Sequence, residues 1–233
     1  MNPDKLFYGQ ARQDKFVANV LKDKSNGYFL EIGSSHPIKI NNTYVLETEY
    51  NWKGIMVEYS NEWLDLYKDF RKNSIHIIQD ARTIDYKTLF EENNVPHNID
   101  YLQIDLEVYN GSTYKTLEKL DNEVLDNYKF ATVTFEHDIY NFPNNHYRRF
   151  SNNFKYTRIL SRDIFKRRGY VCVFEDVGDK NYRNPYEDWY VHPDLVDMNY
   201  IRNLKEKNKD NYIQYHIEGI TDKIISWKSI EYL

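Results

Sequence analysis

Short apolar runs alternate along the chain with amphipathic stretches, in an order that predicts strands followed by helices. Five runs have the length and residue types of buried strands, and they cover residues 27–33, 54–59, 74–79, 100–105 and 130–135. Between them, apolar residues at helical spacing follow capping residues such as Asn42–Thr43, Ser60–Asn61 and Asp85. Four strand–helix alternations of this kind predict a parallel α/β sheet with helices on both faces.

The pattern changes after the fifth run. Residues 139–156 are polar and rich in asparagine, and we predict that they form an insertion that acts as a lid. A helix is expected from Thr157 to Arg168, and the runs 170–174 and 189–191 predict a closing antiparallel hairpin. The expected sheet therefore has seven strands and is mostly parallel. Residues 196–233 are expected to add a polar helix and a tail.

Length and composition favour one soluble domain over 1–233, with a core from about residue 10 to 195. The chain has 233 residues, 41% of them hydrophobic, and no apolar run approaches the length of a membrane span. The amino terminus lacks a basic segment followed by an apolar one, so we expect a cytoplasmic protein. The single cysteine, Cys172, excludes an intramolecular disulfide and a cysteine-rich zinc site. A net charge of -5 with intermixed signs makes nucleic acid an unfavoured partner.

Acidic residues follow every predicted strand of the parallel sheet. In such sheets, ligands bind at the carboxyl ends of the strands, where the strand order reverses. The acids at these ends are Glu31, Glu58, Asp80, Asp105, Glu107, Glu136 and Asp138. Each one alone could equally be a helix cap or a solvated loop residue. Together they would repel one another unless ligands, hydrogen bonds or a cation compensate, which makes this edge the candidate site.

The acids after the second and third strands suit a nucleoside. Glu58 ends the second strand, where a carboxylate can accept both hydroxyls of a ribose, and Asp80 lies where an adenine amino group could donate to it. The first turn, from Gly33 to Pro37, has one glycine and does not match the Gly-x-Gly-x-x-Gly fingerprint. A cofactor without phosphates therefore fits better than NAD or FAD, and an NAD-dependent oxidoreductase is disfavoured.

Five motifs together resemble the FkbM family of S-adenosylmethionine (SAM)-dependent O-methyltransferases. They are residues 29–33 (FLEIG), 41–44 (NNTY), 52–58 (WKGIMVE), 104–107 (IDLE) and 135–137 (FEH). The resemblance covers the chain from about Gln10 to about Leu195. It implies a Rossmann-like class I methyltransferase fold, SAM as cofactor, and a sugar, glycan or nucleotide-sugar hydroxyl as acceptor. Val108 departs from the pattern, because many members have glycine there.

The resemblance also implies roles for individual residues. Glu31 and Gly33 would lie near the methionine part of the cofactor, Glu58 on the ribose and Asp80 near the adenine. We extend the predicted cofactor site to Ser34, Thr43, Tyr59, Ala81 and Asp105. Aromatic side chains of the insertion could stack on a sugar ring, namely Tyr140, Phe142, His146 and Tyr147.

Two ways of activating the acceptor hydroxyl stay open at this point. His137 is our first choice of general base, with Asp105 and Glu136 as catalytic partners, because an imidazole with an ordinary pKa of about 6.5 takes up protons near neutral pH. Alternatively, Mg²⁺ or Mn²⁺ could bind Asp105, Glu136 and His137, followed by Asp138 or Glu107, and acidify the hydroxyls. His36 and His192 are weaker candidates. A lone histidine at a strand end is more often structural.

Two other functions remain as alternatives. A nucleic-acid methyltransferase, for example one acting on RNA, is disfavoured because residues 104–107 do not form an Asp-Pro-Pro-Tyr type of motif and no lysine-rich tetrad is evident. A catalytically inactive Rossmann-like interaction module would explain the glycine-poor first turn. Glu58, Asp80 and Asp105 argue against that module.

Overall fold

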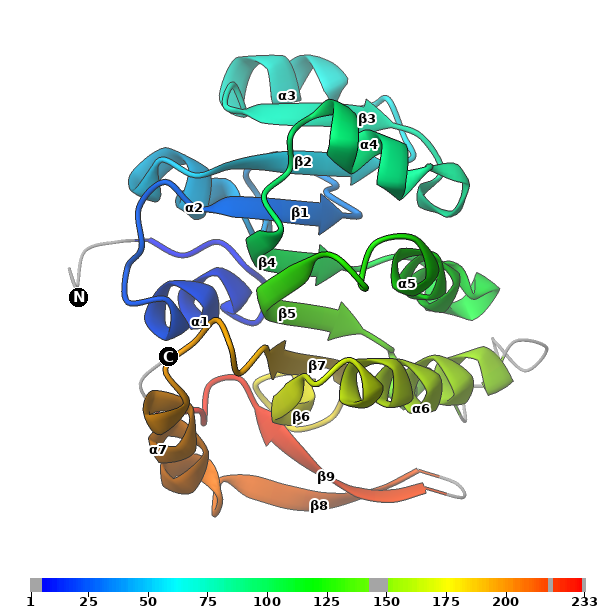
Figure 1. The fold of residues 1–233 in the computed structure, drawn as a ribbon. Helices are drawn as coiled ribbons and strands as arrows, with labels where there is room; N and C mark the ends of the chain where they lie inside the picture. The colour runs from blue at the N-terminus through cyan, green and yellow to red at the C-terminus, as the bar shows by residue number, and fades with distance from the viewer. Residues whose placement is uncertain (1–5, 143–150, 218–219, 232–233) are drawn as a thin grey trace.

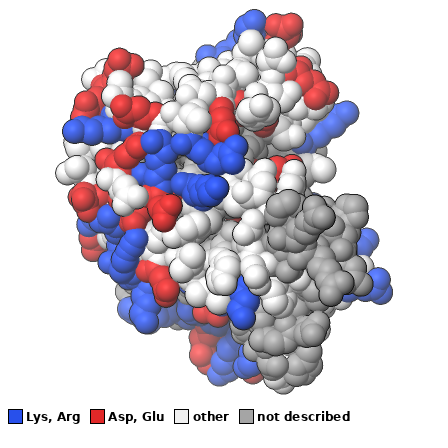
Figure 2. All heavy atoms as spheres, turned by 90° about the vertical axis from the view of Figure 1, so that its right-hand side faces the viewer, with Lys and Arg blue, Asp and Glu red and all other residues white. Residues whose placement is uncertain are grey.

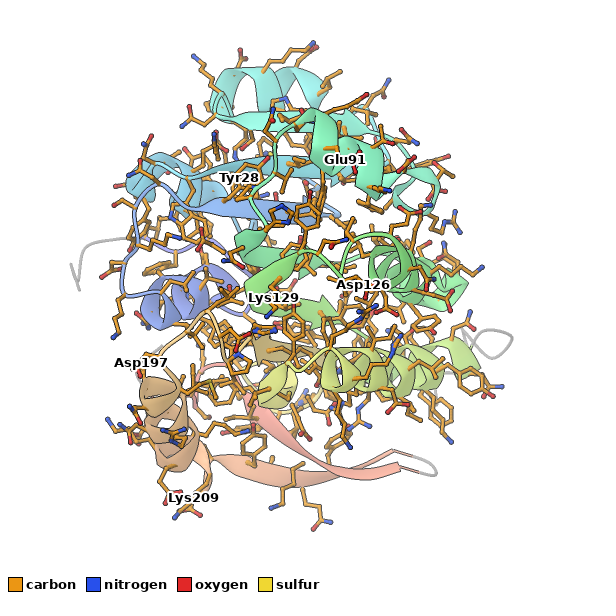
Figure 3. The ribbon with its side chains drawn as sticks, in the orientation of Figure 1. Tyr28, Glu91, Asp126, Lys129, Asp197 and Lys209 are labelled. Carbon is orange, nitrogen blue, oxygen red and sulfur yellow. The ribbon has the colours of Figure 1, made fainter. Side chains whose placement is uncertain are left out.

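The computed structural model describes residues 6–142, 151–217 and 220–231, which form a nine-stranded sheet flanked by helices (Figure 1). The strand order is β3-β2-β1-β4-β5-β7-β6-β9-β8. The strands are β1 (Tyr28–Ile32), β2 (Lys53–Glu58), β3 (Ser74–Ile78), β4 (Asn98–Ile104), β5 (Lys129–Glu136), β6 (Val171–Gly178), β7 (Pro185–Val191), β8 (Tyr212–Ile217) and β9 (Ile220–Ser226). Strands β1 to β5 are mutually parallel, so their carboxyl ends share one edge, on the right in Figure 1. Tyr28 and Lys129, at the starts of β1 and β5, mark the opposite edge (Figure 3).

Helices cover both faces of the sheet and enclose two hydrophobic cores. One core contains side chains from α1 (Gln13–Val20), α2 (Tyr44–Tyr50), α3 (Leu64–Phe70) and α7 (Met198–Asn208). The other contains side chains from α4 (Tyr86–Glu92), α5 (Ser112–Glu123) and α6 (Ser151–Arg167). Short 3₁₀ helices η1 (Ala81–Thr83), η2 (Val108–Asn110) and η3 (Ile139–Asn141) follow β3, β4 and β5.

The central strands are apolar on both faces because each face is covered by helices. In β1, Phe29 packs into the first core, whereas Leu30 and Ile32 pack into the second. Glu31 and Gln103 interrupt this pattern and lie beside each other in the register of β1 and β4. The sheet therefore becomes polar on the first-core face toward its carboxyl edge.

The strand order confirms the predicted fold class. It contains the Rossmann-like run β3-β2-β1-β4-β5, and the β6–β7 hairpin closes it with β7 antiparallel to β5. This is the class I methyltransferase arrangement that the motif resemblance implied. Among the described residues, no helix is long and apolar enough to cross a membrane.

The prediction of seven strands was wrong by two, because the tail contains a second hairpin. Strands β8 and β9 pair with each other, and β9 adds to the sheet alongside β6 through Val177 and Ile225. Ile213, Tyr215 and Ile217 alternate with Gln214 and His216, a strand pattern that the tail interpretation overlooked. Helix α1 was not predicted, and α6 begins at Ser151 rather than Thr157. Residues 143–150 of the predicted lid, which include His146 and Tyr147, lie outside the described residues, so the lid stays a prediction.

Candidate active site

A cavity of about 990 Å³ opens at the carboxyl edge of strands β1 to β5. It lies at the ends of the neighbouring strands β1 and β4, the point at which the strand order reverses. Figure 2 looks onto this edge and shows Lys and Arg side chains gathered near its middle, with Asp and Glu side chains around them. Seven carboxylates line the cavity: Glu31, Glu58, Asp80, Asp105, Glu107, Glu136 and Asp138. Of the described lining residues, Lys39 and Arg82 are the two lysines or arginines.

Gly33 allows the turn after β1 to lie directly against the end of β4. Its φ is +86°, and a Cβ at this position would lie 1.8 Å from the carbonyl oxygen of Asp105. The Gly33 and Ser34 N–H groups donate to the Val57 carbonyl at 2.9 and 3.2 Å, which ties the same turn to β2. The turn is therefore fixed by close backbone contacts rather than by a glycine-rich loop.

Glu58 is held in place but keeps room for a ligand. Its Oε2 accepts the Ser35 N–H at 2.8 Å, and its Oε1 accepts the Ser60 N–H at 3.0 Å. Each carboxylate oxygen can accept a second hydrogen bond. The side chain therefore presents two oriented acceptors to the cavity. Tyr59, which is 77% exposed, adds an aromatic side chain to the wall next to it.

Asp80 also lines the cavity, but Arg82 already binds it. Arg82 Nε and Nη2 donate to Asp80 Oδ1 and Oδ2 at 2.9 and 2.6 Å, and the Arg82 N–H donates to Oδ1 at 3.0 Å. These hydrogen bonds lower the pKa of Asp80. Asp80 thus stays ionised, and a contact with adenine would use a remaining lone pair or the backbone of Ala81, which also lines the cavity.

A buried ionic network supports the wall behind Glu31. Arg71, which is fully buried, donates to Glu47 Oε2 at 2.8 Å and to Thr43 Oγ1 at 2.6 Å, and its Nη1 lies 3.8 Å from Glu31 Oε2. Burial raises the pKa of Glu31 to about 6, against the lowering effect of Arg71. Thr43, predicted as a cofactor contact, lies in this network and outside the cavity wall. The sequence pattern did not identify Arg71 as a residue that supports the site.

Three carboxylates at the ends of β4 and β5 face one another, and we call Asp105, Glu136 and Asp138 the carboxylate trio. Asp105 is deep in the molecule, yet its side chain is exposed to the cavity. Burial and the charges of its two neighbours raise the pKa of Glu136 well above its usual range, and Glu136 hydrogen-bonds Asp105. Burial, then the Asp105 charge, raises the pKa of Asp138 to about 6. The three carboxyl groups therefore titrate as a coupled set, at higher pH than isolated acids.

The prediction of His137 as general base needs correction, because its ring lies outside the cavity wall. His137 is fully buried, and its Nδ1 accepts the Ile139 N–H at 3.2 Å. Its Nε2 lies 3.3 Å from Asp176 Oδ1 and 3.4 Å from Asp188 Oδ1. The ring proton is thus on Nε2, between two carboxylates of β6 and β7. Asp105 and Glu136, the other predicted catalytic residues, do line the cavity.

The predicted metal site is not assembled either. Within the described ranges, the group of potential ligands whose atoms lie within 4.8 Å of one another is His137, Asp176 and Asp188, not Asp105, Glu136 and His137. Arg158 Nε donates to Asp176 at 2.8 Å, and Arg162 Nε donates to Asp188 at 2.7 Å. These guanidinium groups occupy and neutralise the carboxylates, so the group does not fit a divalent cation. We assign none of these residues as a metal ligand.

Sequence reasoning missed several polar residues that line the cavity, among them Gln10, Asn42 and Gln103. Asn42 Oδ1 and Gln103 Oε1 are buried and have no hydrogen-bond partner among the described residues. Gln103 interrupts the apolar run 100–105, which could have marked it as a site residue. Nothing in the sequence around Gln10 marked that residue. Of the two weaker histidine candidates, His36 lines the cavity, and His192 packs against Tyr170 elsewhere.

The raised carboxyl pKa values predict how stability depends on pH. Burial is the main cause of the raised pKa of Asp14, Glu31 and Asp138, each to about 6, and of Glu187, to about 8. Unfolded carboxyl groups titrate at about pH 4, so these four groups hold more protons in the native state than in the unfolded chain between about pH 4 and pH 8. Their contribution to stability therefore falls as pH rises through this window.

We expect a higher melting temperature at about pH 5.5 than at about pH 8, with Glu187→Gln flattening the difference. Thermal unfolding followed by circular dichroism at the two pH values measures this. A wild-type melting temperature that is equal or higher at the alkaline pH would contradict the assignment of buried, proton-holding carboxyls.

Comparisons with known proteins give structural likeness without a family. No protein-family model matches the chain, and no curated protein matches it. A TehB-like SAM-dependent methyltransferase from Corynebacterium glutamicum aligns at TM-score 0.46 and 9% identity, covering 81% of this chain and 90% of that one. A precorrin-6y C5,15-methyltransferase from Geobacter metallireducens aligns at TM-score 0.45 and 14% identity, with 82% and 93% covered. A Streptococcus mutans protein in complex with S-adenosylhomocysteine (SAH) aligns at TM-score 0.49 and 10% identity, covering 80% of this chain and 99% of that one. At these values, neither their ligands nor their activities carry over to this chain.

Proposed function

We propose that this protein is a SAM-dependent methyltransferase that methylates a hydroxyl of a sugar or glycan. The observation that carries the cofactor assignment is Glu58, an oriented carboxylate at the end of β2 on the wall of the switch-point cavity. A carboxylate in this place accepts the two hydroxyls of a ribose. The turn after β1 has a single glycine, Gly33, and does not form the usual pyrophosphate cradle. A nucleoside without phosphates fits both features.

The rest of the cavity suits the other parts of SAM. With the ribose on Glu58, the adenine lies toward Tyr59 and Ala81, and the aminoacyl group lies toward Glu31 and Gln103. SAM carries a sulfonium and an ammonium against one carboxylate, so it is a cation at neutral pH. Seven lining carboxylates against two basic side chains favour a cationic ligand. The volume of about 990 Å³ lies within the usual range for such sites.

In this proposal, the carboxylate trio takes the acceptor proton. SAM, when bound, supplies a methyl group on sulfur; transfer breaks the C–S bond, forms a C–O bond and leaves the electron pair on sulfur. The protein must hold the acceptor oxygen in line with that bond and accept its proton. A carboxylate oxygen of Asp105 or Asp138 receives the proton in this scheme, in place of His137. The sugar part of the proposal is supported by the FkbM-like motifs, and phosphate-bearing nucleic acid is disfavoured by the acidic wall.

Calorimetric titration with SAH tests the cofactor assignment. We expect binding at micromolar or lower concentration, and a loss of at least about 30-fold in Glu58→Ala, because two oriented acceptors are removed. Glu91→Gln is the matched control: it removes an exposed acid on α4, outside the cavity wall, and should bind like wild type (Figure 3).

The outcomes separate the cofactor from the acceptor. Failure of folded wild-type protein to bind SAH would support the inactive-module alternative instead. If SAH binds, incubation with SAM and a panel of sugars and oligosaccharides, read by mass spectrometry, tests the acceptor. Binding of SAH without methylation of any sugar would remove the sugar assignment and keep the cofactor.

A further inference from the structure

The end of the cavity at β4 and β5 is rich in groups that accept hydrogen bonds or attract positive charge. The carboxylate trio lines it, and the wall also carries Gln103 Oε1 and Asn42 Oδ1, two buried oxygens without a partner in the described part of the chain. Buried polar atoms normally find partners, so unpaired oxygens on a cavity wall indicate a ligand that donates hydrogen bonds. The acids thus favour a ligand with positive charge, and the unpaired oxygens favour one that donates hydrogen bonds, as the ammonium group of SAM does.

In the described ranges, the lysine and the arginine that line the cavity lie away from the trio, and buried His137 is the positive group that lowers the pKa of Asp138. Lys39 precedes α2 and Arg82 belongs to η1, so both lining cations come from other parts of the wall. The Arg82 guanidinium is moreover hydrogen-bonded to Asp80. The charges that act on the trio are those of its own members and of neighbouring Glu58, Glu107, Glu187 and His137. Among the described residues, the trio therefore keeps an excess of negative charge that a cationic ligand can balance.

If Glu58 held the ribose and Glu31 the aminoacyl group, the sulfur of SAM would lie near Gly33, on the side of the cavity that Asp105 lines. The ribose and the aminoacyl group both branch from sulfur, and their candidate partners, Glu58 and Glu31, end adjacent strands β2 and β1. The β1 turn that joins these two regions touches the backbone of Asp105 at Gly33. A cofactor that spans Glu58 and Glu31 therefore passes the Asp105 side of the cavity with its sulfur.

We propose that the carboxylate trio recognises the positive charge on sulfur, so that the protein binds SAM more tightly than SAH. This inference rests on the proposed function and names a property of the same site. SAM and SAH differ at sulfur by one methyl group and one positive charge. Methyl transfer removes that charge. The product SAH is therefore bound less tightly than the substrate SAM and dissociates more easily. Product inhibition by SAH is accordingly weak.

Calorimetric titration with both ligands at pH 8 tests the proposal. We expect SAM to bind wild type at least about tenfold more tightly than SAH, from one charge placed a few ångströms from ionised carboxylates. Asp138→Asn and Asp105→Asn each remove one charge with little change of shape. Each should reduce the ratio of the two dissociation constants by at least about threefold, while the SAH dissociation constant stays within about twofold of wild type. Glu91→Gln removes the same charge on α4, outside the cavity wall, and should leave the ratio unchanged.

Retained SAH binding shows that a variant is folded. If one of the two variants does not fold, the other still tests the proposal. A wild-type ratio near one, or a ratio that both variants leave unchanged, would overturn the recognition of sulfur by the trio while leaving the cofactor assignment intact. Failure of wild type to bind either ligand would overturn the proposed function, and this inference with it.

Discussion

Replacing Arg71 by methionine is expected to lower the free energy of unfolding by about 3–5 kcal/mol, because it leaves buried carboxylates without their cation. Arg71 is fully buried, and its guanidinium reaches Glu47, Thr43 and Glu31. Glu47 would keep hydrogen bonds from the Asn73 N–H and the Ser74 hydroxyl, at 2.9 and 2.6 Å, but its charge would remain buried. Urea denaturation followed by tryptophan fluorescence measures the loss.

An exposed arginine provides the matched control for this change. Arg202 lies on α7, is exposed, and hydrogen-bonds Asn199. Arg202→Met should change the free energy of unfolding by no more than about 0.5 kcal/mol. Adding Glu47→Gln to Arg71→Met should restore part of the lost stability, because it removes one unpaired charge. A loss below about 1 kcal/mol in Arg71→Met would show that the network is not a buried ionic one.

The same network bears on the cofactor site, because Glu31 belongs to both. Asn41 Nδ2 donates to the Ser34 carbonyl at 3.1 Å and lies 3.3 Å from Glu31 Oε2, and Arg71 Nη1 donates to Asn41 Oδ1 at 3.0 Å. Arg71 thus fixes the segment after the β1 turn through Asn41. We infer that the loss of Arg71 weakens SAH binding as well as folding.

The fold and the acidic edge were predictable because they depend on local patterns. A parallel strand covered on both faces is a continuous apolar run, so β1, β4 and β5 stood out in the sequence. Residues that end parallel strands meet at one edge wherever the strands lie in the sheet. That rule placed Glu58, Asp80 and Asp105 on the cavity wall without knowledge of the strand order.

Side-chain direction and long-range partners were not predictable in the same way. Glu136 and His137 are adjacent at the end of β5, where neighbouring side chains point to opposite sides. The sequence does not say which side faces the cavity, because that depends on how β6, β7 and α6 pack. Asp176 and Asp188, which take His137 away from the cavity, come from strands that follow it by about 40 and 50 residues. Arg71, which follows α3, likewise bonds residues far from it in the sequence: Glu47 and Thr43 precede it by 24 and 28 residues.

Gly33→Ala is expected to lower the free energy of unfolding by about 3 kcal/mol and to reduce SAH affinity at least about 100-fold. Two effects combine. An L residue at a φ of +86° is strained by about 1–2 kcal/mol, and the new Cβ would lie 1.8 Å from the Asp105 carbonyl oxygen, so the β1 turn or the end of β4 must move. Both segments line the cavity between the expected positions of ribose and sulfur. Urea denaturation and calorimetric titration with SAH measure the two losses.

Gly169→Ala separates the strain from the clash. Gly169 follows α6, has a φ of +82°, and would have no atom within 4 Å of an added Cβ. It therefore pays the same backbone strain without a collision, and we expect a loss of about 1 kcal/mol with unchanged SAH affinity. The difference between the two variants is the contribution of the contact between the β1 turn and Asp105. Equal losses of stability in both, together with wild-type SAH affinity in Gly33→Ala, would show that this contact yields without cost and does not shape the cofactor site.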